Sequence, residues 1–150
     1  MSYKKIIILG PPCVGKTTLA YTALKNKIPS FTTHGLRGHQ LSSMAKAVIN
    51  LDMSLFFDAG GLMIGNLNHK YKNNGFGMRT VLLLPPRDVY LERERIEIER
   101  SENRNQDGSS YYDQHRDKES GTFDLVIKDV LSPQEILDYI IEKTGFKNVI

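Results

Sequence analysis

The sequence is 150 residues long, with 40% hydrophobic and 25% charged residues, a composition typical of one globular domain over residues 1–150. The formal net charge of +3 is small, and no run of Lys and Arg is dense enough to indicate a nucleic-acid-binding surface. A single cysteine, Cys13, excludes an internal disulfide and fits a reducing cytoplasm. No apolar run approaches the roughly 18 residues of a membrane span. We therefore expect a cytoplasmic protein. The Lys-, Asn- and Ile-leaning composition would suit a virus-encoded protein, which would then lie in the host cytoplasm.

A phosphate-binding motif follows the first apolar run. Residues 4–9 predict a short buried strand, and residues 17–24 predict a helix. Between them, G-P-P-C-V-G-K-T fits the template G-x-x-x-x-G-K-[ST], in which backbone N–H groups and a helix N-terminus converge on phosphate. The Lys of this template reaches the β- and γ-phosphates, and the Thr hydroxyl holds Mg²⁺. The residues predicted to bind a nucleoside triphosphate are Gly10, Pro11, Pro12, Cys13, Val14, Gly15, Lys16, Thr17 and Thr18.

The middle of the chain continues to alternate between helices and strands. Residues 39–51 predict a helix, because apolar side chains recur there at helical spacing along one face. The apolar run 53–58 predicts a buried strand that ends on an acid. The other predicted elements are a short strand or extended segment over 28–33, a helix over 62–71 and a buried strand over 80–84.

A long charged helix is predicted from about residue 88 to residue 104. The segment 101–121 that follows contains no aliphatic side chain, so we expect it to be a mobile, lid-like surface loop. The arginines of the helix either bring cations to a bound phosphate or form a solvated surface paired with nearby glutamates. Those on one helical face are Arg93, Arg100 and Arg104, and Arg116 in the loop is a further candidate.

The last two predicted elements are a strand over 124–127 and a helix. Ser132, Pro133 and Glu135 form a helix start, with Ser as the cap, Pro in the first turn and Glu three residues after the cap. The helix is expected to stop near Gly145. Near-continuous apolar strands that alternate with helices predict a three-layer α/β fold, in which a parallel sheet is covered on both faces.

Asp58 is the predicted partner of the phosphate loop. An acid at the end of a hydrophobic strand can hold the metal together with Thr17, and the glycines Gly60 and Gly61 let the chain pass close to a phosphoryl group. The stretch Asp58 to Gly61 also fits the D-x-x-G pattern of GTPases. A nucleotide-binding switch therefore stays open as an alternative, although no N-K-x-D segment follows a late strand to bind guanine.

These motifs resemble those of the small P-loop kinases, a group that includes nucleoside monophosphate kinases, shikimate kinase and gluconate kinase. The resemblance covers nearly the whole chain, and the phosphate loop is its most specific part. It implies a parallel five-stranded sheet in the order 2-3-1-4-5. The segment 33–37 is similar to the T-G-D-x-x-R stretch by which adenylate kinases hold the acceptor phosphate. The substrate-binding residues that this implies are Thr33, His34, Arg37, Gly60 and Gly61.

The resemblance implies a kinase that uses ATP and Mg²⁺, with a small-molecule phosphate acceptor. Relatives with hydroxyl acceptors use an acid near the position of Arg37 as a base, and this chain has His34 or Gly35 in its place. An acceptor phosphate is already ionised and needs no such base. We therefore expect a nucleoside or deoxynucleoside monophosphate as acceptor. The alternative is a hydroxyl acceptor: a nucleoside, a modified base or 5′ end of DNA or RNA, or a small metabolite such as shikimate. The sequence leaves the oligomeric state open. The expected catalytic residues are Lys16, Arg37, Asp58, Arg93, Arg100, Arg104 and Arg116, with Thr17 and Asp58 on the metal.

Overall fold

The computed structural model describes residues 4–11, 14–34, 36, 38–59, 77–100, 112–114, 116 and 123–147. The predicted helix over 62–71 and most of the segment 101–121 lie outside these residues. The strands are β1 (Lys5–Leu9), β2 (Ser30–Thr32), β3 (Leu55–Asp58), β4 (Met78–Leu83) and β5 (Leu125–Ile127). The helices are α1 (Lys16–Lys25), α2 (His39–Ile49), α4 (Arg87–Arg100) and α7 (Pro133–Thr144).

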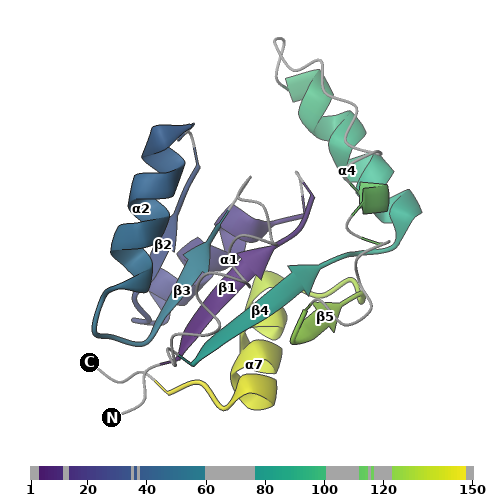
Figure 1. The fold of residues 1–150 in the computed structure, drawn as a ribbon. Coiled ribbons are helices and arrows are strands. Elements are labelled where there is room, and N and C mark those ends of the chain that lie inside the picture. The colour runs from purple at the N-terminus through teal and green to yellow at the C-terminus, as the bar shows by residue number, and fades with distance from the viewer. Residues whose placement is uncertain are drawn as a thin grey trace.

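The five strands form one parallel sheet in the order β2-β3-β1-β4-β5 (Figure 1). This confirms the implied strand order. Because the strands are parallel, their carboxyl ends lie at one edge of the sheet. That edge carries Leu9 before the phosphate loop, Thr32 at the end of β2 and Asp58 at the end of β3.

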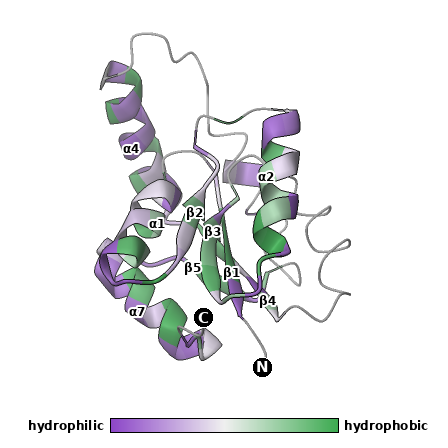
Figure 2. Cartoon of the chain, turned by 90° about the vertical axis from the view of Figure 1, so that its left-hand side faces the viewer, coloured by the Kyte–Doolittle hydropathy of each residue, from purple (hydrophilic) through white to green (hydrophobic). Residues whose placement is uncertain are grey.

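The alternation of side chains along β1 builds the three layers. Ile6 and Ile8 pack in a core cluster with residues of α1 and α7, whereas Ile7 and Leu9 pack with residues of α2 on the opposite face. All four side chains are almost completely buried. Figure 2 shows the hydrophobic strands between the helices, and a largely hydrophilic α4 that extends beyond the sheet. The three-layer α/β prediction is confirmed.

Helix α7 has the ends that the sequence predicts. The Ser132 hydroxyl accepts the Glu135 N–H at 3.2 Å, and the Glu135 carboxylate accepts the Ser132 N–H at 3.0 Å. The second bond lowers the pKa of Glu135. Gly145 ends the helix with a φ of 68°, in the left-handed region that favours glycine. Local sequence is sufficient here because every partner lies within one helical turn. None of the helices in the described part of the chain is long and apolar enough to cross a bilayer.

Two consecutive lysines at the start of β1 bind the carboxyl ends of two helices on opposite faces of the sheet. The Lys4 Nζ donates to Thr144 O of α7 at 2.6 Å, and the Lys5 Nζ donates to Ile49 O of α2. The carbonyls of a helix C-terminus lack partners within the helix and carry partial negative charge, so an ammonium stabilises them. Lys5 is only 1% exposed, and burial lowers the pKa of its ammonium, an effect that Asp52 opposes.

We expect Lys5→Met to reduce the free energy of unfolding by about 1–3 kcal/mol, because it leaves a buried helix carbonyl without this donor. The loss should depend on pH. The folded protein binds the Lys5 proton more weakly than the unfolded chain does, so wild-type stability should rise with pH between the lowered pKa and the ordinary value of 10.5. Urea unfolding of both proteins across that range measures this difference. Lys4→Met is the matched control, and a loss there as large as that in Lys5→Met would contradict the role of burial.

Candidate active site

The phosphate loop begins where β1 meets β4. A Cβ at Gly10 would lie 2.8 Å from Leu83 O of β4 and 2.9 Å from Val14 Cγ2 of the loop, so only glycine fits at this position. Gly15 has a φ of 95° and directly precedes α1, with no side chain to cap the first N–H groups of the helix. The first turn of α1 also contains no acidic residue. Such a helix end attracts an anion.

Lys16 folds back over the loop. Its Nζ donates to Gly10 O and to Pro11 O, both at 2.8 Å. The ammonium therefore lies at the mouth of the loop, although it occupies the first position of a helix, where a cation is unfavourable. A positive charge held against the helix dipole indicates that this position serves an anionic ligand.

Asp58 connects the phosphate loop to the neighbouring strand β2. Its Oδ2 accepts the Thr17 hydroxyl at 3.0 Å and the Thr32 hydroxyl at 2.9 Å. The residue is 2% exposed and lies beside Thr32 in the register of β2 and β3. Mg²⁺ prefers hydroxyl, carboxylate and phosphate oxygens, so Thr17 and Asp58 fit the expected metal. The predicted proximity of Thr17 and Asp58 is present in the structure.

The start of the expected acceptor segment is attached to the same strand end. Thr33 donates both its N–H and its hydroxyl to Asp58 O, each at 3.1 Å, and is 4% exposed. In the structure this hydroxyl thus holds β2 and β3 together. The His34 N–H donates to the Thr32 hydroxyl at 3.1 Å, and the His34 side chain is exposed. His34 is therefore the residue of this pair whose side chain is accessible to a ligand.

A small pocket lies beside the phosphate loop, at the carboxyl ends of β1, β4 and β5. Arg93 and Asp129 contribute charged side chains to a lining that is otherwise apolar or proline. Arg93 is partly exposed, so its guanidinium can contact both the lining and solvent. The lining residues are Val14, Leu83, Pro85, Arg93, Ile127, Asp129, Leu131 and Ile136.

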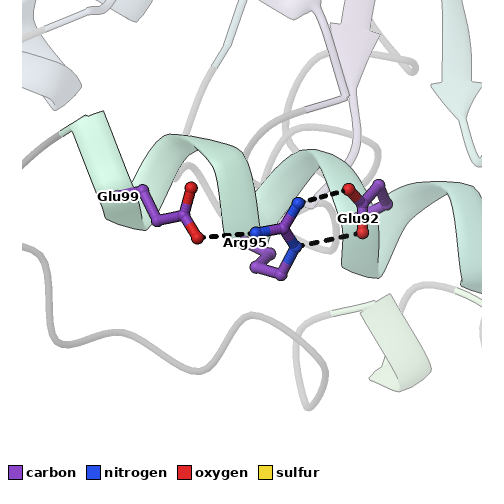
Figure 3. A network of polar contacts seen from close by, with 3 residues as sticks. All are labelled: Glu92, Arg95 and Glu99. Atoms are coloured by element: carbon purple, nitrogen blue, oxygen red, sulfur yellow. Dashed lines mark hydrogen bonds and ion pairs between the residues drawn. The ribbon is translucent and has the colours of Figure 1, made fainter.

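Two arginines of α4, Arg93 and Arg95, have different surroundings. Arg95 donates to Glu92 and to Glu99 on the exposed helix surface, with closest distances of 2.6 Å to each (Figure 3). It therefore belongs to a solvated ion-pair surface of small energetic value. Arg93, two residues earlier, lines the pocket instead. Of these two arginines, Arg93 is the one that lies at the pocket beside the loop.

Tyr112, in the middle of the segment 101–121, packs against the start of α4. Tyr112 is 5% exposed, stacks on Tyr90 at a centroid distance of 5.1 Å and donates its hydroxyl to Pro85 O at 2.6 Å. Burial raises the pKa of Tyr112. The expectation of a surface loop, drawn from the lack of aliphatic side chains, is therefore wrong at Tyr112, because an aromatic ring can replace an aliphatic side chain in the core. Arg116 forms an ion pair with Asp113 at 3.3 Å.

Several predicted residues lie outside the described residues. They include part of the loop, the acceptor arginine, the glycine pair and one helix arginine. Arg100 ends α4, and only its backbone is described. The roles of all of these remain predictions. The residues outside are Pro12, Cys13, Arg37, Gly60, Gly61 and Arg104.

Sequence reasoning missed two features of the site. Thr32 was not singled out, although a polar residue at the end of a strand in a parallel sheet lies at the edge where ligands bind. The pocket beside the loop was missed because Leu83, Ile127 and Asp129 come from distant parts of the chain. No pattern within a single segment could have identified it.

No protein-family model matches the sequence, and no curated protein sequence matches it. Solved structures do. A gluconokinase from Sinorhizobium meliloti is 12% identical with a TM-score of 0.67, and the match covers 97% of this chain and 94% of that one. A tunicamycin resistance protein from Deinococcus radiodurans is 20% identical with a TM-score of 0.66 and 99% coverage of both chains. A shikimate kinase from Aquifex aeolicus is 16% identical with a TM-score of 0.63, covering 94% and 96%.

These similarities extend over nearly the full length of each chain, while the sequence identities are low. They concern the arrangement of strands and helices, and they agree with the sheet order described above. The chain has the fold of the small P-loop kinases of the gluconate and shikimate type.

Proposed function

We propose that this protein is a kinase that transfers the γ-phosphoryl group of Mg²⁺-bound ATP to a small-molecule acceptor. The observation that carries the proposal is the Thr17 hydroxyl bonded at 3.0 Å to the buried Asp58 carboxylate, next to a loop that holds the Lys16 ammonium. Loop, cation and metal-binding oxygens are the three parts that phosphoryl transfer requires on the donor side.

The pocket beside the loop marks where the base of ATP would lie. Its lining is mostly apolar, but it is too small for a planar base, which would enter only if side chains such as Arg93 moved and could then stack on that guanidinium. Val14 links the two parts of the site, because it belongs to the phosphate loop and also lines the pocket. A base in the pocket and phosphates on the loop would thus belong to one nucleotide.

The proposal also concerns the chemical class of the acceptor. The names of two similar structures, a gluconokinase and a shikimate kinase, point to acceptors that are hydroxylated acids rather than nucleotides. We therefore place an alcohol group of a small metabolite first, ahead of the nucleoside monophosphate that the sequence favoured. The monophosphate remains the second proposal, supported by the likeness of segment 33–37, with Arg37, to the phosphate-holding stretch of adenylate kinases.

Three described residues take part in the proposed transfer: Lys16, Asp58 and His34. Lys16 exchanges its bonds to Gly10 O and Pro11 O for bonds to the β- and γ-phosphates. Mg²⁺, when bound, neutralises charge on those phosphates. The acceptor oxygen forms a bond to the γ-phosphorus while the bond to the β-phosphate oxygen breaks, and ADP leaves. An alcohol also loses a proton, which Asp58 at the end of β3 or His34 just after β2 could accept.

The test is ADP release from Mg²⁺·ATP with a panel of acceptors. The panel contains gluconate, shikimate and other hydroxylated acids, nucleosides, ribo- and deoxynucleoside monophosphates, and 5′-hydroxyl DNA and RNA. We expect one small hydroxylated compound to stimulate release strongly, with the phosphorylated product identified by mass spectrometry. Stimulation by a nucleoside monophosphate alone would establish the second proposal. Tight nucleotide binding that no acceptor stimulates would instead favour the nucleotide-binding switch.

A further inference from the structure

Thr32 lies where the metal side and the acceptor side of the site meet. Its hydroxyl donates to Asp58 Oδ2 at 2.9 Å and accepts the His34 N–H at 3.1 Å. The same carboxylate oxygen accepts the Thr17 hydroxyl at 3.0 Å. A continuous chain of hydrogen bonds therefore runs from the backbone of His34 through Thr32 and Asp58 to the phosphate loop.

The hydrogen bonds around Asp58 orient its carboxylate and the Thr17 hydroxyl so that both can bind a metal ion. The terminal torsion of an aspartate is soft, so its carboxylate plane is set by its hydrogen-bond partners. A Thr hydroxyl has one proton and two lone pairs. When Thr17 donates that proton to Asp58, both of its lone pairs remain available to Mg²⁺. Thr32 donates to the same Asp58 Oδ2 that accepts the Thr17 proton. It thereby keeps that oxygen where Thr17 can donate to it and direct its lone pairs to Mg²⁺.

We propose that Thr32 is a positioning residue that aligns Asp58 for Mg²⁺·ATP and connects this alignment to the backbone of the acceptor segment at His34. The proposal rests on the proposed function. In this role Thr32 acts through its hydrogen bond to Asp58 and needs no contact of its own with the phosphates or the metal. Partners of this kind, one step behind the ligands of a metal, typically change metal affinity or activity by about 10- to 100-fold when removed.

The deciding variants change one hydroxyl each. Thr32→Val keeps the β-branched shape that suits a strand and removes both hydrogen bonds, and Thr32→Ser restores the hydroxyl. Thr80→Val is the matched control. Thr80 donates its hydroxyl to Asp124 Oδ2 at 3.1 Å, and it lies in β4 of the same sheet. Thr80→Val thus also removes a Thr-to-Asp bond, but one that is outside the candidate site.

The measurement is the binding of a non-hydrolysable ATP analogue to the full chain, by calorimetry, with Mg²⁺ and with a chelator. We expect Mg²⁺ to increase the affinity of the wild type for the analogue. In Thr32→Val this increase should be about 10- to 100-fold smaller, while the affinity without Mg²⁺ stays at the wild-type value. Thr32→Ser should recover it, and Thr80→Val should retain it. Once an acceptor is known, kcat should fall in Thr32→Val more than the KM for ATP changes.

Two results would overturn the inference in distinguishable ways. A Thr32→Val protein that keeps the wild-type Mg²⁺ effect would overturn this inference alone and leave the kinase proposal standing. A wild-type protein that binds no analogue, or binds it equally with and without Mg²⁺, would overturn the proposed function together with the role of Thr32. A thermal unfolding curve for each variant checks that folding is intact.

Discussion

Lys16→Ala should reduce turnover by about 10²- to 10³-fold, which is the usual effect of removing one donor aimed at developing charge. The Lys16 ammonium is held at the loop mouth by two carbonyls, so it is already placed where the phosphates of a nucleotide would bind. No other described side chain of the loop carries a positive charge. The loss should therefore appear in kcat and in nucleotide affinity together.

The same substitution should leave the fold intact. Lys16 occupies the first position of α1, where a cation opposes the helix dipole by about 0.3–1 kcal/mol. Its removal relieves that repulsion, which offsets the loss of its bonds to the loop. Thermal unfolding should thus show a midpoint close to that of the wild type. This combination, lost activity without lost stability, is expected of a residue retained for function.

Lys25→Ala is the matched control for Lys16→Ala. It removes a lysine from the opposite end of the same helix, where the side chain is exposed and a cation favours the dipole. We expect a small loss of stability and unchanged turnover, the reverse of the Lys16 result. Near-normal turnover in Lys16→Ala, measured with the best acceptor of the panel, would refute the assignment of the phosphate loop.

Asp58→Asn should reduce Mg²⁺-dependent turnover by about 10- to 100-fold. The amide keeps the size of the side chain, and its oxygen can still accept the hydroxyls of Thr17 and Thr32. What it loses is the negative charge that balances a divalent cation. The concentration of Mg²⁺ needed for half-maximal activity should therefore rise, while the protein stays folded.

Asp124→Asn controls for the loss of a carboxylate that binds a threonine. Asp124 Oδ2 accepts the N–H and the hydroxyl of Thr80 at 2.8 and 3.1 Å, outside the candidate site. Titration of Mg²⁺ at fixed ATP compares the two variants. An unchanged Mg²⁺ requirement in Asp58→Asn, or an equal change in Asp124→Asn, would remove Asp58 from the metal site.

The features that the sequence predicted well are those with local causes. The capping box of α7 and the phosphate loop depend on neighbours within a few residues, and both were found where the motifs placed them. Strand β2 was harder to predict. The structure limits this strand to Ser30–Thr32, within the expected range 28–33. Its ends are set by its pairing with β3, which the local sequence does not encode. The burial of Tyr112 against Tyr90 was likewise invisible to a count of aliphatic residues.

The sequence by itself determined the α/β class and the phosphate loop, because periodicity and a glycine-lysine-threonine motif are encoded over short stretches of chain. Only the tertiary structure decided which side chains share a site. Thr17 and Thr32 are 41 and 26 residues from Asp58, yet both donate to one oxygen of its carboxylate. Parallel pairing brings the ends of β2 and β3 and the loop that follows β1 to one edge of the sheet, and such a contact follows from strand order rather than from the neighbouring residues in the sequence.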